Sequence, residues 1–243
     1  SHCERCGRAY YLKQVFMLTP FPDMVRAVIS ESILGRSEKK EQIKFNITNL
    51  FDFADPPHQR IDDYPFGGGN GMIIKPGPVF NAYESINDVS RVIFPTPDGE
   101  LLNHKLAKNL SKEKSLVFIC GHYKGIDQRI RDEIVTDEIS IGDFVLTNGE
   151  LPTMIMIDSI VRLKEGVLNN YDSASKDSFY DILLDGPHYT RPRNFNGMKV
   201  PNVLLSGNHK EIKNWFLNER EIKTKKIRKD LWKKYKSDKK IGV

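Results

Sequence analysis

The stretch that decides the fold reads I-S-I-G-D-F-V-L-T-N-G-E-L-P and runs from Ile139 to Pro152. Its apolar run, Phe144 to Leu146, predicts the end of a buried strand, and Thr147-Asn148-Gly149 predicts a turn directly after it. Proline is favoured at the first position of a helix, so we expect Pro152 to begin a helix that extends to Leu168. Strands that end in a glycine-containing bend before a helix are where α/β proteins bind ligands. The stretch therefore predicts a ligand site.

Two further segments upstream repeat this pattern of strand and glycine-containing bend. Strands are predicted at 91–94, 115–120 and 141–146, and the bends after them are P-T-P-D-G (95–99), G-H-Y-K-G (121–125) and T-N-G-E-L-P (147–152). Because the carboxyl ends of parallel strands meet at the same edge of a sheet, we expect the three bends to converge on one crevice.

The beginning of the chain predicts that the sheet is parallel. Residues 13–18 read as a strand, the apolar spacing over 21–34 predicts a helix stopped by Gly35, and residues 43–47 read as a second strand. This β-α-β order favours parallel strands with right-handed crossovers.

The composition is that of an ordinary globular protein. The chain has 243 residues, of which 39% are hydrophobic and 28% are charged. No run of eighteen or more apolar residues predicts a membrane span, and the polar start does not resemble a signal peptide, so we expect a cytoplasmic location.

Cysteine is scarce, which excludes a disulfide framework and fits a reducing compartment. The chain has three cysteines, Cys3, Cys6 and Cys120. Cys3 and Cys6 form a C-x-x-C pair, but no second pair completes the four ligands that zinc requires. Residues 1–12 are interpreted as a tag remnant or an extension, with a metal site that also uses His2 as the alternative.

Positive charge is concentrated at the end of the chain. Residues 210–243 contain 13 Lys or Arg and 5 Asp or Glu, whereas the whole chain contains 37 and 32. Such a tail on a near-neutral body is typical of nucleic-acid binding. A solvated charged helix gives the same composition, so both interpretations stay open.

A glycine-rich loop interrupts the predicted elements between Phe51 and Pro76. Gly67, Gly68, Gly69 and Gly71 allow a backbone to approach a ligand or a phosphate closely, although the loop has neither a P-loop nor a G-x-G-x-x-G pattern. A flexible loop without a ligand is the alternative.

The last part of the chain reads as a separate helical domain. Turn-forming residues at 169–177 predict the domain boundary, and an apolar patch at 200–205 precedes a predicted helix. Ile212, Trp215 and Phe216 lie on one face of that helix, and we interpret them as core residues rather than nucleobase platforms.

Six motifs follow one another along the chain, and together they are a more specific signal than any one of them alone. They are D-D-Y-P-F-G-G-G-N-G-M (62–72), I-C-G-H-Y-K-G-I-D (119–127), D-E-I-S-I-G-D-F-V-L-T-N-G-E-L-P (137–152), D-S-F (177–179), P-H-Y-T-R-P (187–192) and V-L-L-S-G-N-H (203–209). With these motifs, the chain from about Lys13 onward resembles the bacterial tRNA (guanine-N1)-methyltransferases that modify position 37, beside the anticodon.

This resemblance implies an α/β fold: a parallel sheet with a deep C-terminal trefoil knot of the SPOUT type, followed by a small, mainly helical C-terminal domain. The domains expected are a knotted methyltransferase domain (13–168), a linker (169–180) and a tRNA-binding domain (181–243). The resemblance also implies a homodimer with its active site at the subunit interface.

The cofactor implied by the resemblance is S-adenosyl-L-methionine, held largely by backbone groups. Magnesium dependence is reported for the family, but the sequence indicates no metal ligands. The residues that match the family's cofactor site are Phe94, Pro95, Thr96, Pro97, Gly121, Tyr123, Gly125, Ile126, Ile141, Gly142, Asp143, Phe144, Val145, Leu146, Asn148, Gly149 and Pro152.

The catalytic residues implied by the resemblance are Asp177, as the base that removes the N1 proton, and Arg162, as its partner that favours an anionic guanine O6. The sequence by itself does not distinguish Asp177 from Asp143, Asp158 or Asp181.

The chain departs from the common family pattern at several positions. Lys124 stands where many members have glutamate, Asn148 where glycine is usual, and Phe144 where tyrosine is usual, while Phe94-Pro95-Thr96 replaces Tyr-Leu-Ser. These changes leave backbone contacts possible but put cofactor affinity in question. A knotted methyltransferase acting on another RNA and a non-catalytic RNA-binding protein are the competing functions.

Overall fold

The computed structural model describes residues 12–57, 59–122, 124–168 and 177–241. The chain divides into two compact units, one before and one after the junction of residues 169 and 170. Within the described residues, no helix is long and apolar enough to cross a membrane.

The first unit is built on a five-stranded sheet in the order β2-β1-β6-β5-β7, in which every neighbouring pair is parallel. The parallel sheet predicted from the sequence is thus confirmed. The strands are β1 (Gln14–Thr19), β2 (Lys44–Asn49), β5 (Arg91–Leu101), β6 (Ser115–Ile119) and β7 (Asp137–Ser140). β6 is the central strand and all five of its residues are buried, as expected of a strand covered on both faces.

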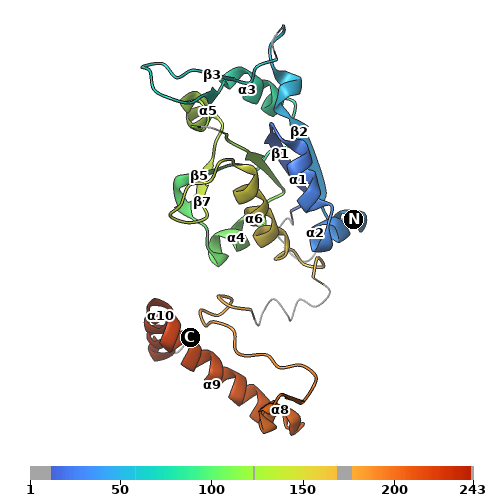
Figure 1. The fold of residues 1–243 in the computed structure, drawn as a ribbon, viewed down its shortest axis with the longest axis vertical. Helices are drawn as coiled ribbons and strands as arrows, with labels where there is room; N and C mark the ends of the chain where they lie inside the picture. Colours follow the sequence, from blue (N-terminus) through green and yellow to red (C-terminus); the bar gives the residue numbers. More distant parts are fainter. Residues whose placement is uncertain (1–11, 58, 123, 169–176, 242–243) are drawn as a thin grey trace. The chain divides into compact units, whose positions relative to one another are not determined.

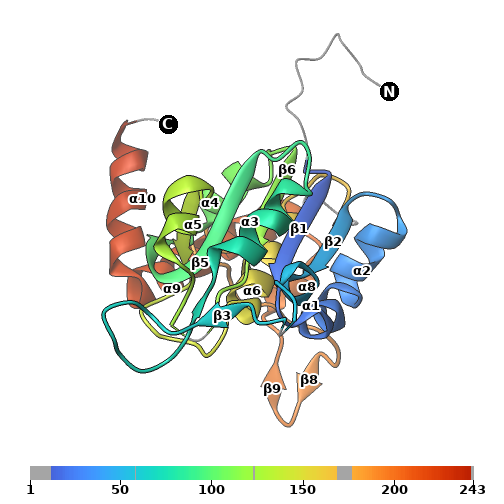
Figure 2. The ribbon, with the colours of Figure 1, turned by 90° about the horizontal axis from the view of Figure 1, so that it is seen from above.

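Helices cover both faces of the sheet (Figures 1 and 2). Side chains alternate along each strand, so each strand contributes residues to a core on either face. One face of β6 packs with α1 (Pro22–Ile29), α2 (Ser32–Lys39), α4 (His104–Leu110) and α6 (Glu150–Val161). The other face packs with the 3-10 helix η1 (Leu50–Phe53), α3 (Pro76–Glu84) and α5 (Gln128–Glu133). Leu116 and Phe118 of β6 belong to the first core, and Val117 and Ile119 belong to the second.

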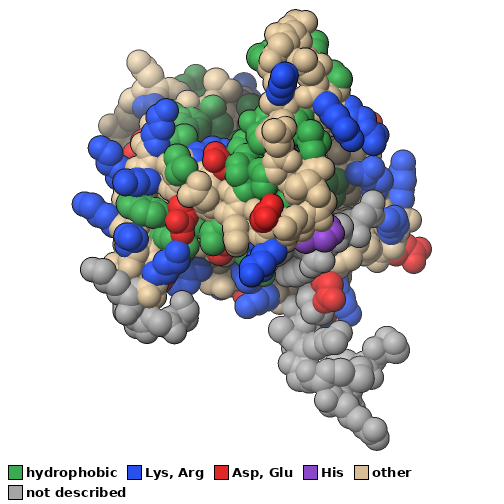
Figure 3. Space-filling model, turned by 90° about the horizontal axis from the view of Figure 1, so that it is seen from below, with side chains coloured by type: hydrophobic (Ala, Val, Ile, Leu, Met, Phe, Trp, Pro, Cys, Tyr) green, Lys and Arg blue, Asp and Glu red, His purple; other side chains and the backbone are tan. Residues whose placement is uncertain are grey.

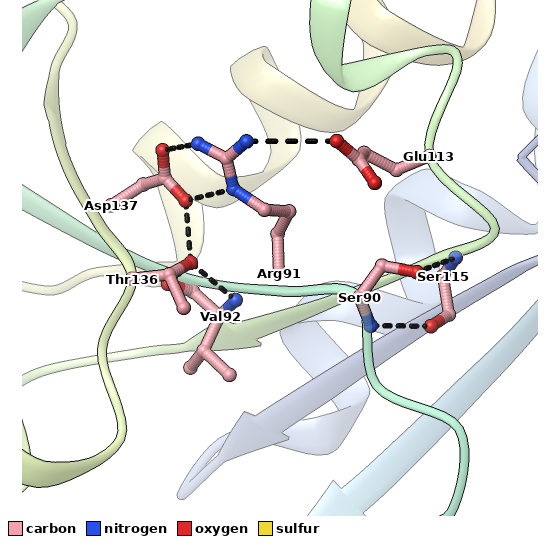
Figure 4. Close-up of polar contacts among 7 residues, drawn as sticks. All are labelled: Ser90, Arg91, Val92, Glu113, Ser115, Thr136 and Asp137. Carbon is pink, nitrogen blue, oxygen red and sulfur yellow. Dashed lines mark hydrogen bonds and ion pairs between the residues drawn. The ribbon is translucent and has the colours of Figure 1, made fainter.

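A group of polar contacts joins β5 to both of its neighbours at the amino end of the sheet (Figure 4). The Arg91 guanidinium binds the Asp137 carboxylate, with Nε 2.7 Å from Oδ2, and lies 3.6 Å from the Glu113 carboxylate. Ser90 and Ser115 exchange backbone-to-hydroxyl hydrogen bonds of 3.0 and 3.3 Å. These contacts set the register of the strands whose carboxyl ends form the pocket described below.

Two predicted elements have different bounds. The helix predicted over 21–34 is two helices, α1 and α2, and Gly35 lies inside the second rather than stopping the first. The chain turns at Ser32, which has a φ of +50°, and the apolar spacing continues across the turn, so spacing alone does not reveal the break. Gly35 is required by space: a Cβ there would lie 2.0 Å from the Ser30 carbonyl oxygen.

The glycine-rich loop is anchored along the segment after β6. Short strands β3 (Asp62–Asp63) and β4 (Ile73–Ile74) pair antiparallel at its two ends. Ile74 then pairs with Ile126, through hydrogen bonds from Ile74 N–H to Gly125 C=O (3.1 Å) and from Asp127 N–H to Ile74 C=O (3.0 Å).

The described residues of the second unit form a hairpin and three helices. The hairpin consists of β8 (Asn194–Phe195) and β9 (Met198–Lys199), and the helices are α8 (Asn202–Leu205), α9 (His209–Ile227) and α10 (Lys229–Ile241). Thr224 is the buried residue of α9, and its hydroxyl accepts the Leu184 N–H at 2.9 Å. The interpretation of Ile212, Trp215 and Phe216 as core residues needs correction, because all three are half-buried. The Trp215 and Phe216 rings lie at tilted angles against those of Tyr189 and His188.

We predict that Gly35→Ala lowers the free energy of unfolding by roughly 1–3 kcal/mol, because the added methyl group would force α2 away from Ser30. The matched control is Gly77→Ala in α3, where a Cβ meets no atom within 4 Å. Alanine should be neutral or stabilising by up to about 1 kcal/mol there. Urea unfolding of both variants measures the difference, and equal stabilities would contradict the close approach at Gly35.

Candidate functional site

A pocket of about 450 Å³ lies at the carboxyl edge of the sheet, within the usual ligand-pocket range of roughly 300–1,000 Å³. As the sequence predicts, the bends after β6 and β7 meet there with the Pro95 turn of β5. The residues that line it are Phe94–Asp98, Gly121, His122, Lys124–Ile126, Arg131, Ile139–Gly142, Phe144–Gly149 and Pro152.

The first wall is a bulge in β5. Pro95 and Glu100 both pair with Ile139, so the four residues between them leave the ladder. Gly99 allows this crossing, since a Cβ there would lie 2.5 Å from the Glu138 carbonyl group. The bulge turns Thr96 and Pro97 into the pocket.

A charged network holds the bulge in place. Arg131 binds Glu138 with two hydrogen bonds of 2.7 Å and binds Asp98 through a third of 2.8 Å. A hydrogen bond from the Thr96 hydroxyl, together with Arg131, lowers the pKa of Asp98 to about 2. Asp98 is therefore ionised at neutral pH, and the charge of Arg131 is compensated by two carboxylates.

The second wall is a close crossing of two backbones. The Gly149 N–H donates to the Gly121 C=O at 2.7 Å. A Cβ on Gly149 would lie 2.6 Å from the Gly121 nitrogen, and a Cβ on Gly121 would lie 2.9 Å from the Phe94 ring. A side chain at Gly149 would displace the Gly121 backbone, and a side chain at Gly121 would displace the Phe94 ring.

The third wall is the loop that follows β7, where the sequence predicts a strand over 141–146. β7 ends at Ser140, and residues 141–147 form a loop instead of a strand. Phe144 is 52% exposed and Val145 is 82% exposed, so the apolar run Phe144 to Leu146 is not the end of a buried strand. Its side chains line the pocket, where they provide a nonpolar surface.

The helix after this loop begins earlier than predicted and ends sooner. α6 starts at Glu150, with Gly149 as its N-cap, and ends at Val161 rather than Leu168. Pro152 is its third residue, a position where the missing N–H costs no helical hydrogen bond.

A buried polar cluster lies where α6 begins. Glu150 is 0% exposed; its Oε1 accepts the Thr19 hydroxyl at 2.6 Å, and its Oε2 has no hydrogen-bond partner among the described residues. Burial raises the pKa of Glu150, against the opposing effects of Thr19 and of the charge on His122. Burial also raises the pKa of the neighbouring Cys120 thiol, which lies 3.4 Å from the Thr153 hydroxyl. Cys120 is therefore a neutral core residue and not a nucleophile.

All the predicted cofactor residues line the pocket except two: Tyr123 lies outside the described residues, and Asp143 is not part of the lining. The lining residues that were not among the predicted cofactor-binding residues are Asp98, His122, Lys124, Arg131, Ile139, Ser140 and Thr147. Most are neighbours of predicted residues in the same bends. Arg131 is the exception, because it reaches the pocket from α5 and its partner Asp98 is 33 residues away.

The two predicted catalytic residues belong to different units. Arg162 is the half-buried C-cap of α6 in the first unit. Asp177 is half-buried in the second unit, where its carbonyl oxygen accepts the Tyr180 N–H at 3.4 Å. The catalytic roles of Asp177 and Arg162 therefore stay predictions.

The described part of the chain contains no group of three or more His, Cys, Asp or Glu side chains that could hold a metal ion. The Cys3 and Cys6 pair and the rest of residues 1–11 lie outside the described residues.

Comparison with known proteins finds relatives over most of the chain. Residues 13–234 match the family model described as tRNA (Guanine-1)-methyltransferase TrmD. The chain is 52% identical to a Staphylococcus carnosus tRNA (guanine-N(1)-)-methyltransferase over 220 residues, which cover 90% of both chains. Proteins of the same name from Brevibacillus brevis and Clostridioides difficile are each 51% identical, over 91% and 90% of this chain and 92% and 96% of their own lengths.

We predict that Glu150→Gln becomes more stable relative to the wild type as the pH rises from 4 to 8. A carboxyl whose pKa is raised by folding contributes stability below its unfolded pKa, and that contribution is lost as the pH rises through the folded value. Glutamine does not ionise and escapes this loss. Melting temperatures across the pH range measure the effect, with the exposed Glu84→Gln as the control. Parallel pH curves for the Glu150 variant and the wild type would contradict it.

Proposed function

The chain belongs to the tRNA (guanine-N1)-methyltransferase family, and we propose that the guanosine it methylates is the one at position 37, next to the anticodon. Family membership makes the chain an enzyme that transfers a methyl group from S-adenosyl-L-methionine to N1 of guanosine in tRNA. The match over 13–234, which includes all three pocket walls, is the observation that carries this function.

The pocket residues suit this methyl donor. S-adenosylmethionine supplies, when bound, a methyl group already activated on a sulfonium. Gly121 and Gly149 bring two backbones to the pocket wall without intervening side chains, and backbone N–H and C=O groups can recognise an adenosine there. Phe144, Val145 and Leu146 offer nonpolar contact, and the ionised Asp98 complements a cationic ligand. Holding the methyl group in line with N1 accounts for about 7–11 kcal/mol of the barrier.

For proton removal we propose Asp177 and Arg162. The Asp177 carboxylate accepts the proton from guanine N1 as the new N–C bond forms, which is worth roughly 10²–10⁴-fold. The Arg162 guanidinium stabilises the negative charge that develops on guanine O6. Arg162 is the C-cap of α6, at the other end of the helix from the pocket wall, and its assignment rests on the family resemblance.

A trefoil knot and a homodimer complete the proposal. The chain leaves β7 at the edge of the sheet and crosses back over the end of β6 at Gly149, and this crossing supports a knot. Asp177 and Arg162 belong to separate units, which is compatible with an active site shared between two subunits, in which Asp177 of one chain serves the pocket of the other.

Contact with tRNA is proposed for the second unit. Its last helices carry the excess positive charge of the chain, with 13 Lys or Arg against 5 Asp or Glu over 210–243, while the rest of the chain has more acidic than basic residues. Figure 3 shows Lys and Arg side chains spread over the face drawn, together with several Asp and Glu side chains. Binding through phosphates predicts an affinity that falls steeply with salt.

The test of this function is the transfer of labelled methyl groups to tRNA transcripts that carry guanosine or adenosine at position 37. We expect labelling of the guanosine transcript alone. Equal labelling of both transcripts would refute position 37 while leaving tRNA methylation intact. No labelling of any tRNA, together with binding of RNA, would favour a non-catalytic RNA-binding protein, and labelling of another RNA would favour a different knotted methyltransferase.

We predict that Asp177→Asn lowers kcat at least 100-fold and leaves the Kd for S-adenosylmethionine unchanged, because the amide cannot accept the N1 proton. Asp158→Asn on the exposed face of α6 is the matched control and should keep ordinary turnover. Single-turnover methyl transfer and calorimetric titration of the cofactor separate the two quantities. Ordinary turnover by the Asp177 variant would remove this residue from the mechanism.

A further inference from the structure

The pocket has two long cationic side chains, and only one of them is paired with carboxylates. Arg131 is bound by Glu138 and Asp98. Lys124 lines the same pocket but forms no ion pair with any described residue. An uncompensated ammonium group in a concave site favours an anionic ligand.

Lys124 is held in a defined position by the glycine-rich loop. Its N–H donates to the Met72 C=O at 3.1 Å. Its aliphatic chain lies on Gly71, where a Cβ would come within 3.0 Å of Cγ and 3.3 Å of Cε, and its Nζ lies 3.5 Å from the position of a Cβ on Gly69. The ammonium group is thus placed between the pocket and residues 67–71 by packing, which reduces the entropy lost when it binds a ligand.

The loop beside this lysine offers further donors. Gly67, Gly68, Gly69 and Gly71 all have positive φ, and no hydrogen bond within the described residues uses the N–H groups of residues 67–71. Their side-chain positions are empty at Gly67 and Gly68, so a ligand can reach the backbone there. Backbone N–H groups in such turns, next to an ammonium group, are typical of sites that bind oxyanions.

We propose that Lys124, with the N–H groups of residues 67–71, binds an oxyanion of the substrate complex, namely a phosphodiester of the RNA close to the target guanosine. The loop is exposed, and Tyr64 and Phe66 before it are exposed too, so a polynucleotide has access to this side of the pocket. The carboxylate of the methionine moiety of the methyl donor has the same chemistry and is the second source. The proposal rests on tRNA being the substrate but does not depend on position 37.

The experiment compares Lys124→Gln with Lys124→Arg and with Lys112→Gln. Lys112 is exposed and precedes β6, at the opposite edge of the sheet, so its substitution removes the same charge away from the pocket. Binding of a tRNA transcript to the full chain is measured from 50 to 300 mM KCl, and binding of S-adenosylmethionine is measured without RNA. Melting temperatures establish that each variant is folded.

For a phosphodiester contact, Lys124→Gln weakens tRNA binding roughly tenfold at low salt. It also reduces the slope of log Kd against log salt by about 1, and cofactor affinity is unchanged. Lys124→Arg retains binding, and Lys112→Gln retains both affinity and slope. If the cofactor Kd rises instead while tRNA binding holds, the oxyanion is the methionine carboxylate. If Lys124→Gln changes neither affinity, the proposal is overturned, whether or not the enzyme methylates position 37.

Discussion

The contact between Gly149 and Gly121 is the constraint on which the rest of the site depends. Two backbones meet there through a hydrogen bond of 2.7 Å. A Cβ on Gly149 would clash with the Gly121 backbone, and a Cβ on Gly121 would clash with the Phe94 ring. The crossing brings the chain from β7, at the edge of the sheet, back over the end of β6 at its centre. It positions the second and third walls of the pocket, because Phe94 packs on Gly121 and residues 141–148 must loop outward before the chain reaches Gly149.

The pocket contains charged side chains of both signs at defined positions. Arg131 is fully used in holding the bulge of β5, through Glu138 and Asp98. Asp98 keeps a depressed pKa of about 2, so it stays anionic, and Lys124 forms no ion pair with any described residue. The site thus presents one anion and one cation at separate positions. A sulfonium cofactor and an RNA phosphate differ in charge in the same way, which makes one pocket suitable for both.

The burial of Glu150 next to the crossing lowers the stability of the fold. Its carboxyl group is removed from water at the start of α6, with one oxygen bonded to Thr19 of β1 and the other unpaired among the described residues. A buried carboxyl group in this state is unfavourable for stability at neutral pH. It nevertheless joins β1 to the segment that follows Gly149, directly behind the pocket wall.

The sequence by itself determined the class of the fold, the position of the ligand site and the family. Parallel strands and three convergent bends follow from local patterns of apolar residues, glycine and proline, which act over a few residues and need no knowledge of the tertiary structure. Six motifs in order identified the methyltransferase family. The tertiary structure decided that Phe144 to Leu146 is an exposed pocket wall, because burial depends on what packs against a segment and not on its own hydrophobicity. It also decided that Gly35 lies inside a helix, against Ser30, and that Arg131 reaches the pocket from α5. The contacts of Arg131 with Asp98 and of Gly149 with Gly121 join residues far apart in the chain, and no local pattern records such contacts.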